Sequence, residues 1–121
     1  PVKLAITTTG DGPEAALDPR FGRASRFLIY DLETDAYEVV DNSQNLAAAQ
    51  GAGVQAAETV ARAGVGGLIT GHCGPKAFRV LSVARIPVYN TDAATVGEAI
   101  ARYRDGVLTA ATAADVEGHW L

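Results

Sequence analysis

The chain has 121 residues, with ten Lys or Arg against fourteen Asp or Glu, which gives a formal net charge of -4. Hydrophobic residues make up 48% and charged residues 20%, which is typical of a single globular domain and excludes a disordered chain. One cysteine excludes an intramolecular disulfide, no apolar run approaches the roughly 18 residues of a membrane span, and nothing resembles a signal peptide. We therefore expect a cytoplasmic protein with no nucleic-acid or membrane partner, in which a local basic patch would hold any anionic ligand.

The first half of the chain predicts three strands and a long loop. Residues 2–9 begin with alternating apolar and polar side chains and are rich in β-branched types, as a sheet strand would be. Residues 26–32 and 37–41 are two further strands joined by a polar turn, hence an antiparallel hairpin. The stretch 10–25 carries three Gly and two Pro and is long for a structureless connection, which is typical of a functional loop.

The second half predicts helices alternating with strands. One helix ends at Gly64, and the apolar run 65–70 that follows lacks alternation, as expected for a strand covered on both faces. The remaining elements are a helix over 74–84 with Pro75 in its first turn, a strand over 86–90 and a helix over 95–106. Apolar residues mark one face of each predicted helix. They are Val54, Ala57, Val60 and Ala61 in the first helix, Phe78, Val80, Leu81 and Val83 in the second, and Val96, Ile100 and Tyr103 in the third.

These elements predict an α/β fold with a mixed sheet. Strand, helix and strand over 65–90 form a βαβ unit, which makes its two strands parallel with a right-handed crossover. We expect one domain over 1–121, with a core over 1–106. The remainder, 107–121, has no clear period and is expected to be an irregular, mobile tail that includes His119 and Trp120.

Three loops are predicted to meet at one edge of this sheet. Ligands of open α/β sheets bind beyond the carboxyl ends of the parallel strands. If the first strand also runs parallel to the last two, this edge brings together Thr7–Gly12, Gly71–Lys76 and Asn90–Ala93. The long loop 10–25 leaves from the same edge and could fold over it.

The stretch "GHCGPK", Gly71 to Lys76, is the strongest local candidate for a site. Pro75 and Lys76 open a helix, whose free N–H groups and positive dipole end favour an anion. Gly71 and Gly74 would let a ligand approach the backbone closely. The alternative is an ordinary turn between a strand and a helix, with Gly for conformational reasons.

Cys73 leaves three interpretations open. At a helix start its thiol would have a lowered pKa and could bind a soft metal or attack an electrophile, but a lone Cys is also commonly a buried packing residue. His72 could supply an imidazole to the same metal. One Cys and two His cannot complete a four-ligand zinc site within one chain, so a metal would need ligands of its own or open positions.

A second candidate stretch is "DPRFGR", Asp18 to Arg23. Arg20 and Arg23 flank Phe21 and Gly22, and two guanidinium groups beside an aromatic ring suit an anion with a polarizable face. The alternative is solvated loop charge, with Phe21 as an anchor to the core.

Nucleotide-binding and hydrolytic motifs have little support. "GAGVQA", Gly51 to Ala56, matches a dinucleotide fingerprint in letters only, because an Ala-rich stretch and not a strand precedes it. No Walker loop and no G-x-S-x-G elbow occurs.

The order and spacing of four segments resemble the dinitrogenase iron-molybdenum cofactor-binding family over nearly the whole chain. The segments are "FGRAS", "RFLIYDLETDAYEVV", "GAGVQAAETVARAGVGGLITGHCGPKAF" and "IPVYNTDAATVGEAIARYRDGVL". Within that family the chain is most similar to the orange-protein group of anaerobic sulfate reducers. The resemblance implies a ribonuclease H-like three-layer fold with a five-stranded mixed sheet flanked by helices.

The resemblance also implies a carrier or storage protein, not an enzyme, for a preformed molybdenum-copper sulfide cluster held without covalent links. The family's "FGR" falls on Phe21, Gly22 and Arg23, and its "G-x-x-G-P-x-A" falls on Gly71, Gly74, Pro75 and Ala77. Gln50 stands where many relatives have a His, and Cys73 falls at a variable place of the motif.

We therefore hypothesise a non-enzymatic, cytoplasmic binding protein whose cluster lies in a cleft between the 10–25 loop and the 71–76 turn. A thiomolybdate-type cluster is anionic and brings its own sulfide, so the protein need supply only positive potential, N–H donors and apolar contact. His72 and Cys73 would be optional copper contacts. The expected site residues are Arg20, Phe21, Gly22, Arg23, Gly71, His72, Cys73, Gly74, Pro75 and Lys76.

Three alternatives stay open. The cargo could be an iron-molybdenum or iron-sulfur cofactor precursor. The chain could instead be a regulatory or adaptor module that binds a small anionic ligand or an ATPase of the MinD/ParA type, as a monomer or weak dimer. Thiol-based enzyme chemistry at Cys73 is the third, with His72 as the one clear acid-base partner.

Overall fold

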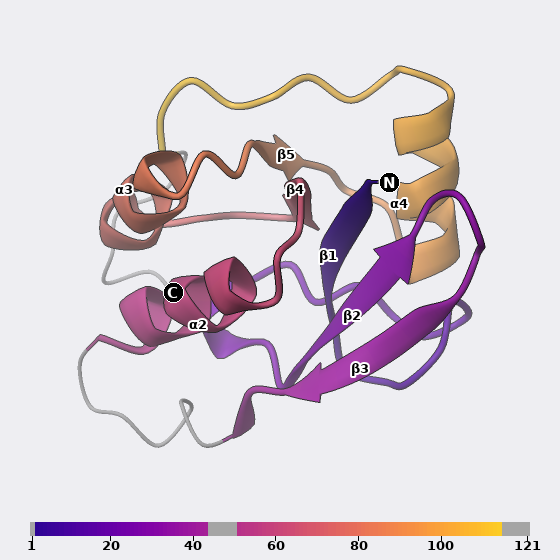
Figure 1. The fold of residues 1–121 in the computed structure, drawn as a ribbon, viewed down its shortest axis with the longest axis horizontal. Coiled ribbons are helices and arrows are strands. Elements are labelled where there is room, and N and C mark those ends of the chain that lie inside the picture. Colours follow the sequence, from indigo (N-terminus) through magenta and orange to yellow (C-terminus); the bar gives the residue numbers. More distant parts are fainter. Residues whose placement is uncertain (1, 44–50, 115–121) are drawn as a thin grey trace.

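The computed structural model describes residues 2–43 and 51–114, and within them a five-stranded mixed sheet. The strands lie in the order β3-β2-β1-β4-β5 (Figure 1). β1 pairs antiparallel with β2 and parallel with β4, and β4 pairs parallel with β5. The strands are β1 (Lys3–Thr8), β2 (Arg26–Asp31), β3 (Tyr37–Asp41), β4 (Gly67–Thr70) and β5 (Val88–Asn90). Each lies within its predicted range, and the mixed sheet is confirmed; the ribonuclease H-like assignment stays a prediction.

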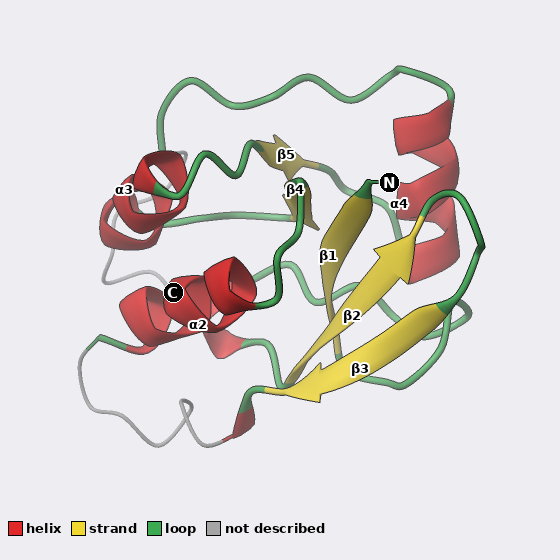
Figure 2. Cartoon of the chain, in the orientation of Figure 1, coloured by secondary structure: helices red, strands yellow, loops and turns green. Residues whose placement is uncertain are grey.

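Helices cover both faces of the sheet (Figure 2). α2 (Ala52–Arg62) and α3 (Pro75–Val83) lie on one face, α4 (Val96–Arg104) lies on the other, and a short 3-10 helix, η1 (Phe21–Arg23), lies in the long loop. Alternate strand residues point to two cores. Ala5, Leu68 and Val88 pack with α2 and α3, whereas Leu4, Ile6 and Ile69 pack with α4. β4 is buried along its whole length, as its unbroken apolar run predicted.

Two predicted helix faces need correction. In α2 the buried residues are Ala52, Ala56, Ala57 and Val60, and Val54 is only partly buried. The buried stripe includes small alanines because α2 packs closely against η1 and α3. In α3 the buried residues are Ala77 and Leu81, while Val83 is 81% exposed. Val83 comes two residues after Leu81, which places it on the opposite side of the helix.

Residues 107–114 contain no named helix or strand but lie beside β5. The Ala111 N–H donates to the Val88 carbonyl at 2.7 Å, and Ala110 forms a bridge with Tyr89. Residues 115–121, with His119 and Trp120, lie outside the described part of the chain. Among the described residues, no helix combines the length and apolar character needed to cross a membrane.

Candidate functional site

The long loop 10–25 is hydrogen-bonded to the turn that follows β4. The His72 N–H donates to the Pro19 carbonyl at 2.7 Å, and the Phe21 N–H donates to the His72 carbonyl at 3.1 Å. Gly71 is required here, because a Cβ atom at that position would lie 2.6 Å from the Pro19 carbonyl oxygen. The expected cleft between loop and turn is therefore closed at Pro19–Phe21 by backbone pairing. Candidate binding surfaces lie on either side of this bridge.

On one side, η1 meets the first turn of α2, which in turn packs against the first turn of α3. A Cβ atom on Gly22 would lie 3.0 Å from the Gly53 Cα, and one on Gly53 would lie 3.5 Å from the Ala77 Cβ. Neither α2 nor α3 has a side-chain cap at its N-terminus. Free N–H groups and the positive ends of two helix dipoles therefore come together beside Arg23, an arrangement that favours an anion.

On the other side of the bridge, a hollow of about 520 Å³ lies between the three strand-end loops. Leu17, Pro19 and Ala93 give it apolar walls, and His72 and Asn90 contribute polar groups. The Asn90 Nδ2 donates to the Gly71 carbonyl at 3.0 Å, so β5 also holds the turn in place. The predicted meeting of the strand-end loops at this edge is therefore confirmed for the turn after β4 and the loop after β5.

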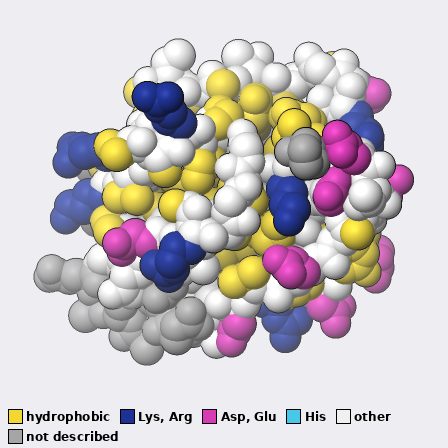
Figure 3. Space-filling model, viewed as in Figure 1, with side chains coloured by type: hydrophobic (Ala, Val, Ile, Leu, Met, Phe, Trp, Pro, Cys, Tyr) yellow, Lys and Arg dark blue, Asp and Glu magenta, His cyan; other side chains and the backbone are white. Residues whose placement is uncertain are grey.

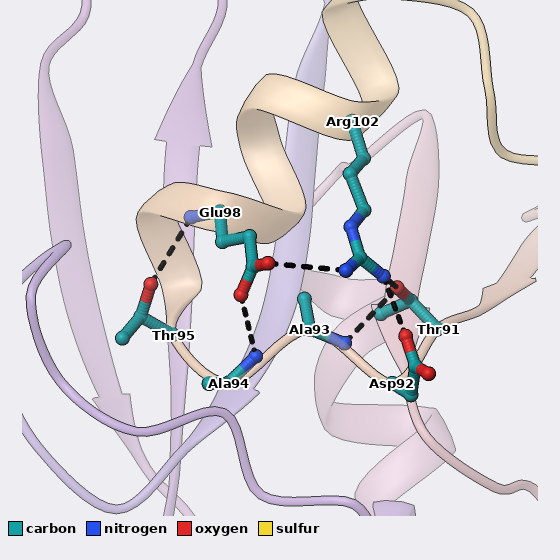
Figure 4. Close-up of polar contacts among 7 residues, drawn as sticks. All are labelled: Thr91, Asp92, Ala93, Ala94, Thr95, Glu98 and Arg102. Atoms are coloured by element: carbon teal, nitrogen blue, oxygen red, sulfur yellow. Dashed lines mark hydrogen bonds and ion pairs between the residues drawn. The ribbon is translucent and has the colours of Figure 1, made fainter.

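A polar network fixes the loop that walls this hollow (Figure 4). Arg102 donates to the Asp92 carboxylate at 2.6 Å, to the Glu98 carboxylate at 3.0 Å and to the Thr91 hydroxyl at 3.0 Å. Glu98 in turn accepts from the Ala94 N–H at 2.8 Å. The hydrogen bond from Arg102 and its positive charge lower the pKa of Asp92. Arg102 thus neutralises much of the negative charge at the rim of the hollow.

The predicted site residues divide by exposure. Arg20, Pro75 and Lys76 are exposed, and Arg23 and His72 are partly exposed. Gly22, Gly71 and Gly74 are buried in the turns that they form. Phe21 is fully buried and its ring stacks on Phe27 with centroids 5.6 Å apart. Phe21 therefore anchors the loop to the core, as the alternative interpretation proposed, and it contributes to the bridge through its backbone N–H.

Cys73 is a packing residue in this structure. Its side chain is 1% exposed and lies in the core between the sheet and the helices α2 and α3. Its Sγ is 3.7 Å from the Gly74 carbonyl oxygen. No group of three or more His, Cys, Asp or Glu within residues 2–43 and 51–114 could hold a metal ion. The burial favours the structural interpretation of the thiol over the two chemical ones.

The site also contains residues that the sequence did not single out. Gly53 was assigned to a weak nucleotide fingerprint, but in the structure its backbone is what Gly22 of η1 contacts. Nothing in the sequence marked Leu17 or Asn90 as a site residue, apart from its position near the end of a strand. Gln50, where many relatives have a His, lies outside the described residues.

Comparison with known proteins gives one family. The sequence pattern of the dinitrogenase iron-molybdenum cofactor family matches residues 2–106. An uncharacterized protein of Methanocaldococcus jannaschii is 31% identical over 95 residues, which cover 76% of this chain and 80% of that protein.

Two solved structures share the whole fold. The apo form of the orange protein from Desulfovibrio gigas is 40% identical with a TM-score of 0.92, covering 94% of this chain and 96% of that one. A Thermotoga protein described as a NifB protein is 35% identical with a TM-score of 0.84, covering 98% of this chain and 100% of that one.

Proposed function

This chain belongs to the dinitrogenase iron-molybdenum cofactor family, and we propose that it binds a preformed anionic metal-sulfur cluster and stores or delivers it without catalysing a reaction. The observation that carries the proposal is that η1 meets the first turn of α2, which packs against the first turn of α3, and that neither helix has a side-chain N-cap hydrogen bond. The family match and the 40% identity to the orange protein support it.

The charges at this meeting point suit an anion. Each helix N-terminus stabilises a nearby surface anion by about 0.3–1 kcal/mol, and Arg23 and Lys76 add full positive charges from η1 and from α3. Arg20 precedes η1 and is exposed. Because the cluster would bring its own sulfide, N–H donors and cations are sufficient, and no ligand set within the chain is required.

We identify the cluster as a molybdenum-copper sulfide, following the resemblance to the orange-protein group. A copper contact by His72 stays a prediction, because His72 lines the hollow on the other side of the bridge from η1. The Cys73 thiol would contact copper only if the turn opened, because it is 1% exposed. An iron-molybdenum or iron-sulfur cluster would suit the same donors and is a separate outcome of the test.

The experiment measures metal content and visible absorption of protein isolated anaerobically, and then of metal-free protein titrated with tetrathiomolybdate and copper. We expect molybdenum and copper to bind in fixed ratio with charge-transfer absorption bands. Uptake of an iron cluster instead would retain cluster binding but reject the molybdenum-copper identity. Absence of any stoichiometric cluster would reject the proposal.

Variants locate the cluster. We expect Arg23→Ala and Lys76→Ala each to weaken cluster uptake. Arg62→Ala is the matched control, because Arg62 lies in the last turn of α2, at the opposite end of that helix. Unchanged uptake in both test variants would remove the basic residues from the site. Docking of a MinD/ParA-type ATPase, a monomeric or weakly dimeric state, and a cytoplasmic location stay predictions.

A further inference from the structure

The helices α2, α3 and α4 end in the same way, but α3 uses a different residue. The residue after the C-cap has a left-handed backbone in each helix, and it is Gly64 after α2 and Gly106 after α4, both with φ of 72°. After α3 it is Arg85, with φ of 61°. Glycine is the favoured residue here because a Cβ atom makes this conformation costly. A strained residue of this kind points to a role for its side chain.

Arg85 lines a hollow of about 330 Å³ between the end of α3 and β5. Phe78 and Ser82 of α3 line this hollow, together with Ile86, Pro87 and Ala111. Val83, which follows Ser82 in α3, is 81% exposed. Most of the residues that line the hollow are apolar, but its exposed surface is divided between polar and apolar atoms.

Three exposed cations lie on α3 and in the turn after it. Lys76, Arg79 and Arg85 are exposed and form no ion pair with any residue in the described part of the chain. Arg102 and Arg104 of α4, by contrast, are paired with carboxylates. Figure 3 shows Lys and Arg side chains gathered over α3, while most Asp and Glu side chains on this face lie over α4 and the β2–β3 hairpin.

We propose that Arg79, Val83, Arg85 and the adjoining hollow form a docking surface, here called the α3 surface, for a partner protein. The partner presents an acidic segment that carries an apolar side chain. Its carboxylates pair with Arg79 and Arg85, and its apolar side chain enters the hollow. The strain at Arg85 is retained because glycine would remove one of these cations. Lys76, in the first turn of α3, places the α3 surface one helix length from the proposed cluster site.

An acidic protein fits the α3 surface better than a polyanion or a membrane does. Nucleic-acid binding needs many phosphate contacts and suits a basic protein, whereas this chain has a net charge of -4 and few cations on this face. A hollow lined by apolar residues and by Arg85, with Arg79 exposed on the same helix, instead suits one anchoring side chain with flanking charges, the usual core and rim of a protein interface.

The test uses the full chain without cluster, so its outcome is independent of the proposed function. The probe is a synthetic peptide of glutamates around one leucine, and backbone amide shifts are followed by NMR during titration. We expect saturable shifts confined to residues 78–87 and 111, weakened by salt. Replacing the peptide leucine by alanine should weaken binding.

Arg85→Gly is the decisive variant, because it removes the cation and relieves the backbone. We expect peptide binding to weaken by up to about fivefold, as for loss of one exposed ion pair, with unchanged or higher stability against urea. Arg79→Gln should weaken binding similarly, and Val83→Gln should also weaken it. The matched controls are Arg26→Gln, an exposed arginine on β2, and Val107→Gln, a valine that is 65% exposed.

Three results would overturn the proposal. The first is that the amide shifts lie outside the α3 surface or do not occur. The second is that Arg85→Gly binds the peptide as tightly as the unaltered protein does. The third is that single-stranded DNA or anionic lipid vesicles bind this face as tightly as the peptide does. The last result would assign the face to a polyanion or a membrane and not to an acidic protein.

Discussion

Gly22 of η1 and Gly53 of α2 touch through their backbones, because a Cβ atom on Gly22 would lie 3.0 Å from the Gly53 Cα. A Cβ atom on Gly53 would point elsewhere, to the Ala77 Cβ at an ordinary 3.5 Å. A methyl group added at Gly22 would therefore disturb the contact, whereas one added at Gly53 would not. The contact sets how closely Arg23 approaches the first turns of α2 and α3.

Gly22→Ala should destabilise the protein by about 1–3 kcal/mol, because the methyl group must push η1 away from α2. It should also weaken cluster uptake, since the two helix starts would separate from Arg23. Gly53→Ala is the matched variant and should leave stability unchanged or raise it by up to about 1 kcal/mol through helix propensity. Urea unfolding measures both, and equal losses in the two variants would contradict the assigned contact.

Thr7→Val should destabilise the protein by about 1–3 kcal/mol. The buried Thr7 hydroxyl contacts the Asp18 carbonyl at 2.6 Å and the Thr70 hydroxyl at 2.9 Å, and both would lose a buried partner. Thr70→Val removes only the shared bond. A double-mutant cycle should therefore give a coupling of about 0.5–1.5 kcal/mol. Additive losses would show that the two hydroxyls do not depend on each other.

Cys73→Ala should cost about 1–2 kcal/mol of stability, for one buried sulfur and the space it leaves, and should retain the cluster. The native thiol should react with a disulfide reagent far more slowly than the same thiol in urea, because it is 1% exposed. Loss of the cluster in Cys73→Ala at unchanged fold, or fast reaction of the native thiol, would restore Cys73 as a ligand candidate.

Arg102→Gln should raise the pKa of Asp92 toward the ordinary aspartate value of about 3.9, because Arg102 is what lowers it. A carboxyl group with a lowered folded-state pKa stabilises the fold above its unfolded pKa, and this contribution is lost as pH falls through the folded pKa. The stability difference between the two proteins should therefore shrink in acid. Carbon NMR of the carboxyl groups measures the pKa.

Arg104→Gln is the control for that experiment, since Arg104 pairs with Asp35 at 2.7 Å. It should leave the pKa of Asp92 unchanged. A pKa of Asp92 that does not move in Arg102→Gln would show that the ion pair does not form in solution.

Local patterns sufficed for most of the secondary structure. Pro75 and Gly64 marked a helix start and a helix end, and the unbroken apolar run 65–70 marked a buried strand. Burial was harder to predict, because an apolar residue has no fixed side in a helix until its neighbours are known. Val83 is the example, since Leu81 and not Val83 faces the core.

The site was predicted less completely than the fold. Strand-end geometry correctly brought the turn after β4 and the loop after β5 together, but backbone pairing between Pro19 and His72 closes the cleft that was expected there. Backbone pairing of this kind does not depend on particular side chains, so no sequence pattern predicts it. The same applies to Gly53, whose contact with Gly22 joins residues far apart in the chain.

By itself the sequence determined the strands, the helices and the edge of the sheet where the strand-end loops meet, because hydrophobic period, proline and glycine act over a few residues. Only the tertiary structure decided that Cys73 and Phe21 lie in the core, that the long loop is joined to the turn at His72, and that Arg85 occupies a backbone conformation suited to glycine. These outcomes depend on contacts between distant segments, which form only when the sheet and both helix layers are in place.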